Sequence, residues 1–236
     1  MTQSETKIAV AKGELGSKIE GWLRGNYGVS IRIEGRPLSY KQSVGSLEFV
    51  PMTSKDVPMC VANGLVKYGI TGNDLVDNYN LGAGVRILKT LKELDFGKGD
   101  LVLFSEKSAL QRLASLKQGC KVVAPAYYYN LLVFGEAGDY IRRNFGAFEV
   151  IQVEGSTEGF VLNGWADFGY DITTLLRKEA QEEKSRTTLL YNRLTVVENV
   201  ESRPTQAILL SKDTPECSAE AFETLLNFAK ACVPQN

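Results

Sequence analysis

The sequence predicts an α/β fold built mainly from parallel strands. Short apolar runs rich in Val and Ile recur along the 236 residues, and segments with the apolar spacing of helices separate them. Several of the apolar runs end in glycine-bearing turns. A strand followed by a helix and another strand is the unit of a parallel sheet. The alternation therefore predicts parallel pairing with helices on the sheet faces.

Strands are expected where a short apolar run ends at a turn signal. Lys7–Ala11 is the first such run, and Lys12-Gly13 ends it. Tyr68–Gly72 likewise runs into a glycine turn. In chain order, strands are predicted at Lys7–Ala11, Ser30–Glu34, Leu47–Met52, Tyr68–Gly72, Val85–Leu94, Leu101–Phe104, Lys121–Ala124, Glu149–Val153, Ala166–Ile172, Leu194–Val200 and Gln206–Leu210.

Helices are expected where apolar residues recur on one face or where a helix start is visible. Ser54 has the character of a helix start, because Asp56 falls in the first turn and Pro58 is tolerated near a helix N-terminus. Ala219–Cys232 is amphipathic and closes the chain. In chain order, helices are predicted at Gly16–Leu23, Ser54–Asn63, Asn73–Asn78, Asn130–Phe145, Phe160–Trp165 and Ala219–Cys232.

Composition and charge narrow the function classes. Hydrophobic residues make up 44% of the chain and charged residues 23%, which is the balance of a globular protein. The formal net charge of -1 argues against a nucleic-acid or membrane-surface protein, because such proteins normally carry a basic excess. It leaves room for a small anionic ligand, which a few local groups can bind.

The chain contains no histidine, and its four cysteines are widely spaced. The missing histidine removes Ser-His and Cys-His nucleophilic sites, histidine bases and His-ligated metals, so any metal would be a hard, oxygen-bound ion such as magnesium. Without a CxxC spacing, the cysteines are expected to be reduced thiols, buried and structural in preference to nucleophilic. They are Cys60, Cys120, Cys217 and Cys232.

The N-terminal segment Met1–Thr6 is polar and leads directly into the first strand. We expect no signal peptide, and no apolar run is long enough to cross a bilayer. The expected location is the cytoplasm.

Polar turns at strand ends are the candidate binding elements. Three of them are Lys12-Gly13, Thr71-Gly72-Asn73-Asp74 and Glu154-Gly155-Ser156-Thr157-Glu158. In open α/β sheets, ligands bind at the carboxyl ends of strands, where backbone N–H groups attract phosphate. Taken singly, each turn is an ordinary loop. Together they favour a cleft for a polar, phosphorylated ligand, and the alternative is an α/β core with ordinary turns.

The order of these turns carries a resemblance to a known family. Lys7–Gly13 (KIAVAKG) resembles the opening strand and Lys-Gly turn of the ATP phosphoribosyltransferase family. Lys55–Asp74 resembles that family's "KDVP…V…G…GITGxD" block and is the most specific match. Further similarities follow in the same order, at Leu94–Lys98 (LDFGK), Val153–Glu158 (VEGSTE), Gly164–Asp167 with Asp171-Ile172, and Asn192–Glu198.

The resemblance implies a two-lobed fold like a type II periplasmic binding protein, with an interlobe cleft. It implies lobe I at residues 1–93 and 170–212, lobe II at 94–169, and a C-terminal helical extension at 213–236. The implied reaction joins N1 of ATP to C1 of 5-phosphoribosyl pyrophosphate (PRPP), releases pyrophosphate with Mg²⁺, and opens histidine biosynthesis. The ribose ring becomes cationic as the bond between its C1 and the pyrophosphate breaks, so carboxylates near the ring assist the reaction.

The site residues that follow from these motifs form two groups. The candidate catalytic residues are Asp171, Glu154 and Glu158. The candidate substrate-binding residues are Lys12, Gly13, Lys55, Asp56, Thr71, Gly72, Asp74, Gly155, Ser156, Tyr127, Ser185, Arg186, Thr187 and Thr188. A metal ligand set is not defined by the sequence.

The phosphate loop of the family is an acidic residue, a short spacer and then Thr-Gly-x-Thr-Leu. This sequence does not contain that loop intact. Two segments are candidates, Thr173–Leu176 and Ser185–Leu189, and we prefer the second because it directly precedes Asn192-Arg193-Leu194. That choice makes residues 173–184 an insertion and places Arg186 where the family has Gly. An Arg would hold phosphate with its side chain, whereas Gly lets the backbone approach.

Two further departures concern the acceptor. The family's Arg-Pro before Lys55 is Thr53-Ser54 here, and its Lys-Tyr-Pro segment is Tyr127-Tyr128-Tyr129. Both changes remove a cation, so we expect ATP to be a poor acceptor and a smaller nitrogen heterocycle or nucleotide a better one. The tyrosines either stack on a flat ring or pack between a strand and a helix.

The leading prediction is therefore a phosphoribosyltransferase that uses PRPP and a nitrogen heterocycle or nucleotide. The alternatives are a non-catalytic or regulatory small-molecule-binding relative and a different enzyme on the same lobed fold. The chain resembles short family forms, which depend on a partner related to histidyl-tRNA synthetase. We expect a homo-oligomer, a possible partner of that kind, and no nucleic-acid or membrane partner.

Overall fold

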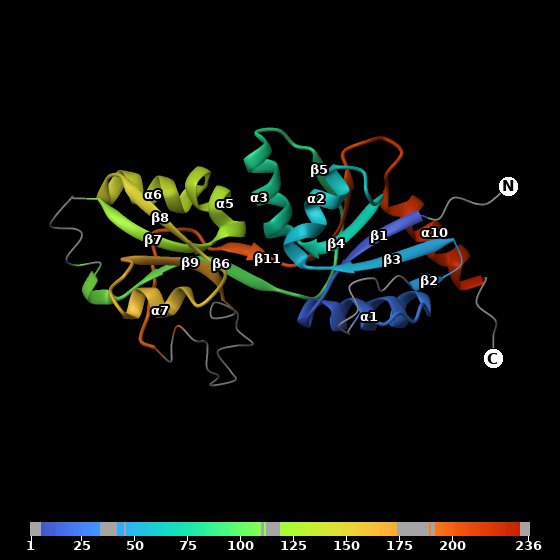
Figure 1. The fold of residues 1–236 in the computed structure, drawn as a ribbon, viewed down its shortest axis with the longest axis horizontal. Coiled ribbons are helices and arrows are strands. Elements are labelled where there is room, and N and C mark those ends of the chain that lie inside the picture. The colour runs from blue at the N-terminus through green and yellow to red at the C-terminus, as the bar shows by residue number, and fades with distance from the viewer. Residues whose placement is uncertain are drawn as a thin grey trace. The chain divides into compact units, whose positions relative to one another are not determined.

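The computed structural model describes residues 6–33, 42–44, 46–109, 111, 119–173, 189 and 192–231. Contacts divide the chain into two compact units, Met1–Gly97 with Gln206–Asn236, and Lys98–Thr205. Each unit is built on one mixed sheet flanked by helices (Figure 1). The division differs from the one expected from sequence, because residues 170–205 fall in the second unit.

The first unit contains a sheet with the strand order β2-β3-β1-β4-β12-β5. Strands β3, β1 and β4 are parallel neighbours, whereas β2 and β12 pair antiparallel. The elements are β1 (Thr6–Ala11), α1 (Glu14–Tyr27), β2 (Gln42–Val44), β3 (Leu47–Met52), the 3₁₀ turn η1 (Ser54–Asp56), α2 (Val57–Ala62), β4 (Tyr68–Gly72), α3 (Asn73–Ala83), β5 (Leu88–Glu93), β12 (Ala207–Lys212) and α10 (Ala219–Ala231).

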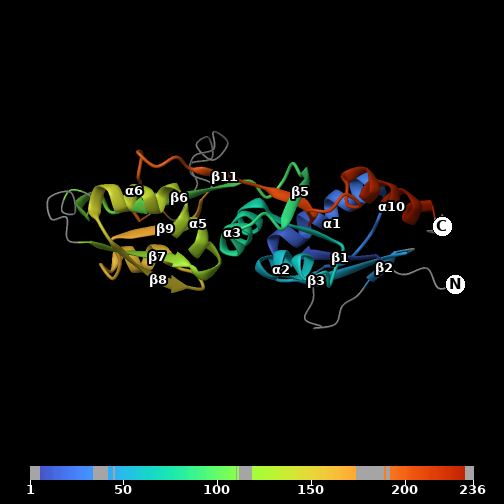
Figure 2. The ribbon, with the colours of Figure 1, turned by 90° about the horizontal axis from the view of Figure 1, so that it is seen from above.

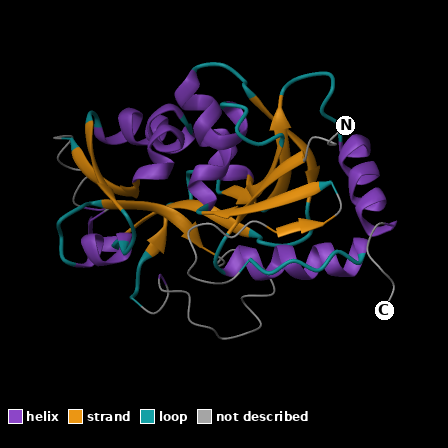
Figure 3. Cartoon of the chain, turned by 45° about the vertical axis from the view of Figure 1, so that its right-hand side comes forward, coloured by secondary structure: helices purple, strands orange, loops and turns teal. Residues whose placement is uncertain are grey.

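Side-chain alternation along the strands separates two cores in the first unit. Ile8 and Val10 of β1 join a cluster with residues of α1 and α10, whereas Ala9 joins a second cluster with α2. Successive strand residues point to opposite faces, so one sheet supports both cores. Helices α1 and α10 therefore cover one face, where they lie close together, and α2 covers the other (Figures 1 and 3).

The second unit contains a sheet with the order β10-β6-β9-β7-β8, and β11 also pairs with β6. Strands β9, β7 and β8 are parallel neighbours, and β6 is antiparallel to β9. The elements are β6 (Gly99–Ser105), β7 (Cys120–Pro125), the 3₁₀ turn η2 (Ala126–Tyr128), α5 (Tyr129–Phe134), α6 (Glu136–Phe145), β8 (Phe148–Val153), α7 (Thr157–Leu162), β9 (Phe168–Thr173), β10 (Thr195–Val196) and β11 (Arg203–Thr205).

The helices of the second unit also lie on both faces of their sheet. Val161 of α7 packs in a cluster with Val102, Phe104 and Val123 of the strands. Phe145 of α6 packs on Phe168 with ring centroids 5.3 Å apart. Figure 1 shows α7 on one side of the sheet and α5 with α6 on the other, and Figure 2 shows α5 and α6 from above.

Several sequence expectations need correction. The sheets are mixed and not mainly parallel, because β12 pairs antiparallel with its neighbours in the first sheet and β6 pairs antiparallel with β9 in the second. The predicted helix Asn130–Phe145 is two helices, since Gly135 has an extended backbone that ends α5. The helix predicted at Phe160–Trp165 begins earlier, at Thr157, and ends at Leu162.

The strand predicted at Ser30–Glu34 is absent from its described part, residues 30–33. Ile31 and Ile33 are buried in the first core, which explains the strand-like alternation. The Ile33 N–H donates to the Glu20 carboxylate, a side-chain acceptor. Of the predicted strand Leu194–Val200, only Thr195–Val196 forms a strand, which pairs with Phe104 and Ser105 of β6, and the Val197 N–H donates one further hydrogen bond to the Leu103 carbonyl.

None of the helices in the described part of the chain has the length and apolar character needed to span a bilayer.

Candidate functional site

Three loops of the first unit meet at one edge of its sheet. Because β3, β1 and β4 are parallel neighbours, their carboxyl ends share an edge. The loops that follow them carry the predicted residues of this unit. These are Lys55 and Asp56 after β3, Lys12 and Gly13 after β1, and Gly72 and Asp74 at the end of β4.

Lys12-Gly13 forms a fixed turn at this edge. The Lys12 N–H donates to the Met52 carbonyl at 2.8 Å, which ties the end of β1 to the end of β3. Gly13 has φ 75° and ψ -149°, a backbone conformation that is essentially restricted to glycine. The sequence signal Lys-Gly therefore reflects a real backbone requirement at the point where α1 begins.

Thr71 connects β4 to the Lys55 turn. Its side chain is fully buried, and its hydroxyl donates to the Ser54 carbonyl at 3.0 Å. Asp56 accepts a hydrogen bond from the Thr53 hydroxyl at the start of the same turn. The exposed residues Lys55 and Asp56 are thus held at the edge by a buried threonine below them.

Asp74 is a buried carboxylate in the first turn of α3. It is 3% exposed, and a Cβ added at Gly72 would lie 2.2 Å from its Oδ1. No residue larger than glycine fits there without moving the carboxylate. Gly72 therefore allows the Asp74 carboxylate to approach the backbone at the end of β4.

The second unit repeats this strand arrangement. Strands β9, β7 and β8 are parallel neighbours, so their carboxyl ends share one edge. Asp171 lies near the end of β9, Tyr127 follows β7, and Glu154, Gly155 and Ser156 follow β8. The structure thus brings the predicted catalytic carboxylates together at one edge.

Asp171 is hydrogen bonded through both carboxylate oxygens. The Thr157 hydroxyl donates to Oδ2 at 2.8 Å, and the Ile172 N–H donates to Oδ1 at 2.8 Å. The Thr157 oxygen also lies 3.5 Å from Oε2 of Glu158. Because Thr157 is fully buried, its hydroxyl is a fixed donor beneath the two carboxylates.

The pKa of Asp171 is raised above its ordinary value. Burial is the main cause, and the charge of Glu158 raises it further, whereas the hydrogen bonds from Ile172 and Thr157 oppose the rise. A carboxyl with a raised pKa and two donors to its charged form is a candidate functional group.

The Glu154–Ser156 loop exposes its backbone. Ser156 has φ 60° and ψ 38°, the left-handed conformation that is uncommon for a non-glycine residue. A Cβ added at Gly155 would meet nothing within 4 Å, and all three residues are exposed. Outliers of this kind are frequent where a loop binds a ligand.

Tyr127 lies partly exposed in the turn after β7. Its ring packs edge-on against Tyr128 with centroids 4.7 Å apart, and Tyr128 packs on Tyr170 at 6.5 Å. Tyr128 is buried and Tyr129 is exposed. One tyrosine of the three thus fills the core, while Tyr127 keeps an accessible part.

The candidate phosphate loop, Ser185, Arg186, Thr187 and Thr188, lies outside the described residues, as do residues 174–184. Their predicted roles therefore stay predictions. Among the residues that are described, no group of three or more Cys, Asp or Glu side chains could hold a metal ion.

The described cysteines are free thiols, and two of them are buried. Burial, with the charge of Asp167, raises the pKa of Cys120 to about 12. A thiol of that kind is not a nucleophile near neutral pH. The structural role expected from sequence fits Cys120.

Sequence reasoning left two connecting residues without a role. Thr157 belongs to the turn Glu154–Glu158 that the sequence singled out, but it was assigned no role. The one sequence feature that could have indicated a role is its hydroxyl, placed directly before Glu158. Asn73 accepts hydrogen bonds at Oδ1 from the Asp74 N–H at 3.0 Å and the Gln206 N–H at 2.9 Å. It links the start of α3 to the residue before β12, a partner 133 positions away that no local pattern reveals.

The fold and these edges define an α/β protein with polar loops at the carboxyl ends of the parallel strands of two sheets, where α/β proteins that bind small molecules have their sites. A family model described as ATP phosphoribosyltransferase matches residues 53–228. The chain therefore belongs to the ATP phosphoribosyltransferase family, which confirms the resemblance drawn from the sequence.

Individual relatives agree with the family match. The chain is 28% identical over 201 residues to the ATP phosphoribosyltransferase of Methanococcus maripaludis strain C5, covering 84% of this chain and 63% of that protein. It is 25% identical to the ATP phosphoribosyltransferase of Cereibacter sphaeroides, covering 91% of each. The chain thus spans less than two thirds of the first relative and nearly all of the second.

A solved structure shows the same fold. The ATP phosphoribosyl transferase (HisG:HisZ) complex of Thermotoga maritima contains a chain that matches with a TM-score of 0.66 and 17% identity, covering 96% of this chain and 98% of that one. At this identity the likeness concerns the fold, and it supports the expected two-lobed α/β class.

Proposed function

We propose that this chain transfers the phosphoribosyl group of PRPP to N1 of ATP. The bond between C1 of the ribose and N1 of the adenine forms, and the bond between C1 and the pyrophosphate oxygen breaks. Pyrophosphate leaves with the bonding electron pair. The Asp171–Thr157–Glu158 cluster carries the proposal, because it lies at a strand edge within the region that matches the family model.

The two carboxylates suit the electronic demand of this reaction. Positive charge develops on the ribose ring as the pyrophosphate leaves, and a fixed carboxylate stabilises that charge. Asp171 is held by Thr157 and the Ile172 N–H, so little reorganisation is needed when the charge develops. Glu158 lies near Asp171 and adds a second negative group. Glu154, the first residue of the loop after β8, is a third candidate.

The phosphate groups of PRPP and ATP need cations and N–H donors. We assign this part to Lys12 and Lys55 at the edge of the first sheet and to the backbone of Gly155 and Ser156 at the edge of the second. Arg186 is proposed as a further side-chain clamp. Gly13, Asp56, Thr71, Gly72 and Asp74 shape the first edge around the two lysines.

Magnesium is proposed to enter with PRPP. The described residues offer no preformed cage, but Asp171 and Glu158 place two carboxylates together. Mg²⁺ commonly binds through one or two carboxylates and the phosphates of its substrate, so this donor set fits the ion. When bound, the ion neutralises the leaving pyrophosphate.

ATP is the proposed acceptor because the family and the cited relatives carry it in their names. The second candidate is a nitrogen heterocycle with fewer phosphates, which the sequence departures at Thr53-Ser54 and Tyr127 favour. Tyr127 supports it, because its half-exposed ring offers a flat surface and no ammonium group.

We propose a cytoplasmic homo-oligomer that acts in histidine biosynthesis. A regulatory partner related to histidyl-tRNA synthetase is also proposed, since the Thermotoga maritima neighbour is a HisG:HisZ complex. Size-exclusion chromatography with light scattering tests the homo-oligomer. Pyrophosphate release with and without such a partner tests the dependence.

The decisive experiment is a pyrophosphate-release assay with PRPP, Mg²⁺ and a panel of acceptors. We expect turnover with ATP, with the N1-phosphoribosyl product identified by mass spectrometry. Turnover with a smaller heterocycle and little with ATP would select the second candidate. No turnover with any acceptor, with or without the partner, would contradict the enzymatic proposal and leave a binding protein.

A further inference from the structure

A hollow of about 530 Å³ lies at the other end of the first sheet, away from the proposed substrate loops. Thr6 and Lys7 begin β1, Lys67 directly precedes β4, and Lys212 ends the antiparallel strand β12. Lys12, Thr71 and Asp74 lie at the opposite ends of β1 and β4. The hollow is therefore separate from the edge discussed above, although both use the same strands.

The lining of the hollow is cationic. Among the nine described residues that line it are three lysines, Lys7, Lys67 and Lys212, and none of these nine residues is an aspartate or glutamate. The chain as a whole has a net charge of -1, so this concentration of positive charge is local. An electrostatic field of this sign selects a negative ligand.

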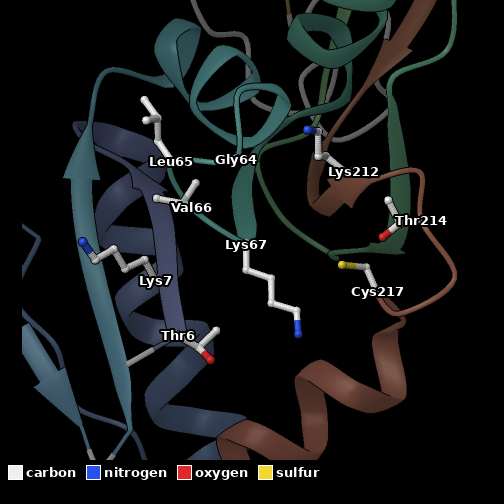
Figure 4. A pocket seen from close by; sticks show the side chains of 9 residues that line it. All are labelled: Thr6, Lys7, Gly64, Leu65, Val66, Lys67, Lys212, Thr214 and Cys217. Carbon is white, nitrogen blue, oxygen red and sulfur yellow. The ribbon is translucent and has the colours of Figure 1, made fainter. Parts of the chain in front are cut away.

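Lys67 is the central group. In Figure 4 its side chain extends into the hollow, with Thr6 on one side and Thr214 and Cys217 on the other. Its ammonium lies 5.5 Å from the centroid of the Tyr68 ring, a weak contact that leaves its hydrogen-bonding capacity for a ligand.

The neighbouring charges are only loosely engaged. The Lys7 ammonium lies 3.9 Å from Oε2 of Glu48, at the limit of an ion pair. The pKa of Glu216 lies below its ordinary value, mainly because its carboxylate has hydrogen bonds with its own backbone N–H and with the Thr214 hydroxyl. The charges of Lys67 and Lys89 lower this pKa further. Because Glu216 is exposed to solvent, its attraction for Lys67 is screened and an anion can compete with it.

We propose that this hollow is a second binding site, which takes a small multiply charged phosphorylated ligand. Lys67 binds the anion directly, and Lys212 swings toward it from the rim, since lysine acts as a flexible point charge, while Lys7 adds positive charge from its place beside Glu48. The volume is within the range of small-molecule sites. Thr6 supplies a hydroxyl, and Val66 and Cys217 each add apolar surface to the lining.

The test is an NMR titration of the full chain with sodium tripolyphosphate at constant ionic strength, without divalent ions. We expect saturable shifts at Thr6, Lys67 and Cys217. Lys67→Gln should weaken binding about tenfold or more, whereas Lys67→Arg, which keeps the charge, should stay within about threefold. Melting temperatures of the variants show that they are folded.

Two matched lysines control for general charge effects. Lys18→Gln removes an exposed lysine of α1 that pairs with Glu14, and Lys12→Gln removes one of the two lysines at the proposed substrate edge. Both should leave the tripolyphosphate affinity of this site within about twofold. An equal loss in either control, no saturable binding, or shifts confined to the loops after β1 and β8 would overturn the proposal. Because no step uses turnover, failure here is distinguishable from failure of the proposed reaction.

Discussion

The first and second sheets can be compared strand by strand. In each, three adjacent parallel strands end at one edge, β3, β1 and β4 in the first and β8, β7 and β9 in the second. The first edge presents Lys12, Lys55 and the exposed Asp56, while Asp74 is buried at 3% exposure. The second edge presents carboxylates, with Asp171 held by Thr157. One strand arrangement thus supports an edge that carries two lysines and an edge whose charged candidates are carboxylates.

The two aspartates illustrate what this difference means. Asp74 lies in the first turn of a helix against Gly72, where no larger residue fits. Asp171 lies near a strand end, with two donors to its carboxylate and a second carboxylate nearby. We infer that Asp74 serves mainly the fold and Asp171 mainly the reaction, and the following experiments test that contrast.

The largest effect is expected at Asp171. Asp171→Asn removes the negative charge beside the developing ribose cation, so pyrophosphate release should fall by about 100-fold or more. The melting temperature should stay near wild type. Asp74→Asn should give the reverse pattern, a lower melting temperature with turnover preserved in the folded fraction. Loss of stability and turnover together in Asp171→Asn would assign it a structural role.

A pair of glycines tests the same contrast through the backbone. Gly72→Ala places a Cβ 2.2 Å from Oδ1 of Asp74, so it should lower the free energy of unfolding by about 1–3 kcal/mol, measured by urea denaturation. Gly155→Ala meets nothing within 4 Å and should change the free energy of unfolding by less than about 0.5 kcal/mol. Equal destabilisation by both substitutions would contradict the distinction between the two edges.

Thr157→Val tests whether the threonine hydroxyl positions Asp171. The hydrogen bond from Thr157 lowers the pKa of Asp171, so its removal should raise that pKa. The acidic limb of the kcat/KM profile should therefore move to higher pH, while Thr157→Ser, which keeps the hydroxyl, should retain the wild-type limb. A limb that is identical in all three proteins would remove Thr157 from the site.

The smallest expected effect is the pH dependence of stability. Burial raises the pKa of Asp171, so the folded chain holds this proton more tightly than the unfolded chain. Its stabilising contribution is present below the ordinary pKa, near pH 4, and is lost as pH rises through the folded pKa. Asp171→Asn does not titrate, so its free energy of unfolding, relative to wild type, should rise between about pH 3 and pH 7. A constant difference across urea denaturations at these pH values would contradict the raised pKa.

The sequence predicted elements best where the local pattern and the packing coincide. Lys7–Ala11 and Tyr68–Gly72 are buried strands, and the motif carrying Lys55–Asp74 indicated the family now shown by the comparison. Ser30–Glu34 failed because alternation records which side chains are buried, not whether the backbone pairs. The pattern cannot show that the Ile33 N–H finds the Glu20 side chain.

The candidate site was predictable at the level of loops and not of contacts. Glycine turns after strands indicated both edges, because the carboxyl ends of parallel strands must meet. The role of Thr157 requires knowing that α7 begins beside β9, and the link from Asn73 to Gln206 joins distant segments. Such pairings depend on the tertiary fold, which local spacing does not encode.

The position of β12 has a consequence for synthesis on the ribosome. This strand comes from the C-terminal part of the chain, yet it lies between β4 and β5 and hydrogen bonds to both. Until it emerges, β4 and β5 each lack their neighbour on that side, while residues 98–205 have already been translated. The second unit can therefore fold first during elongation, and the first sheet must wait for residues 207–212, leaving one edge each of β4 and β5 unpaired and exposed to chaperones and to aggregation in the interval.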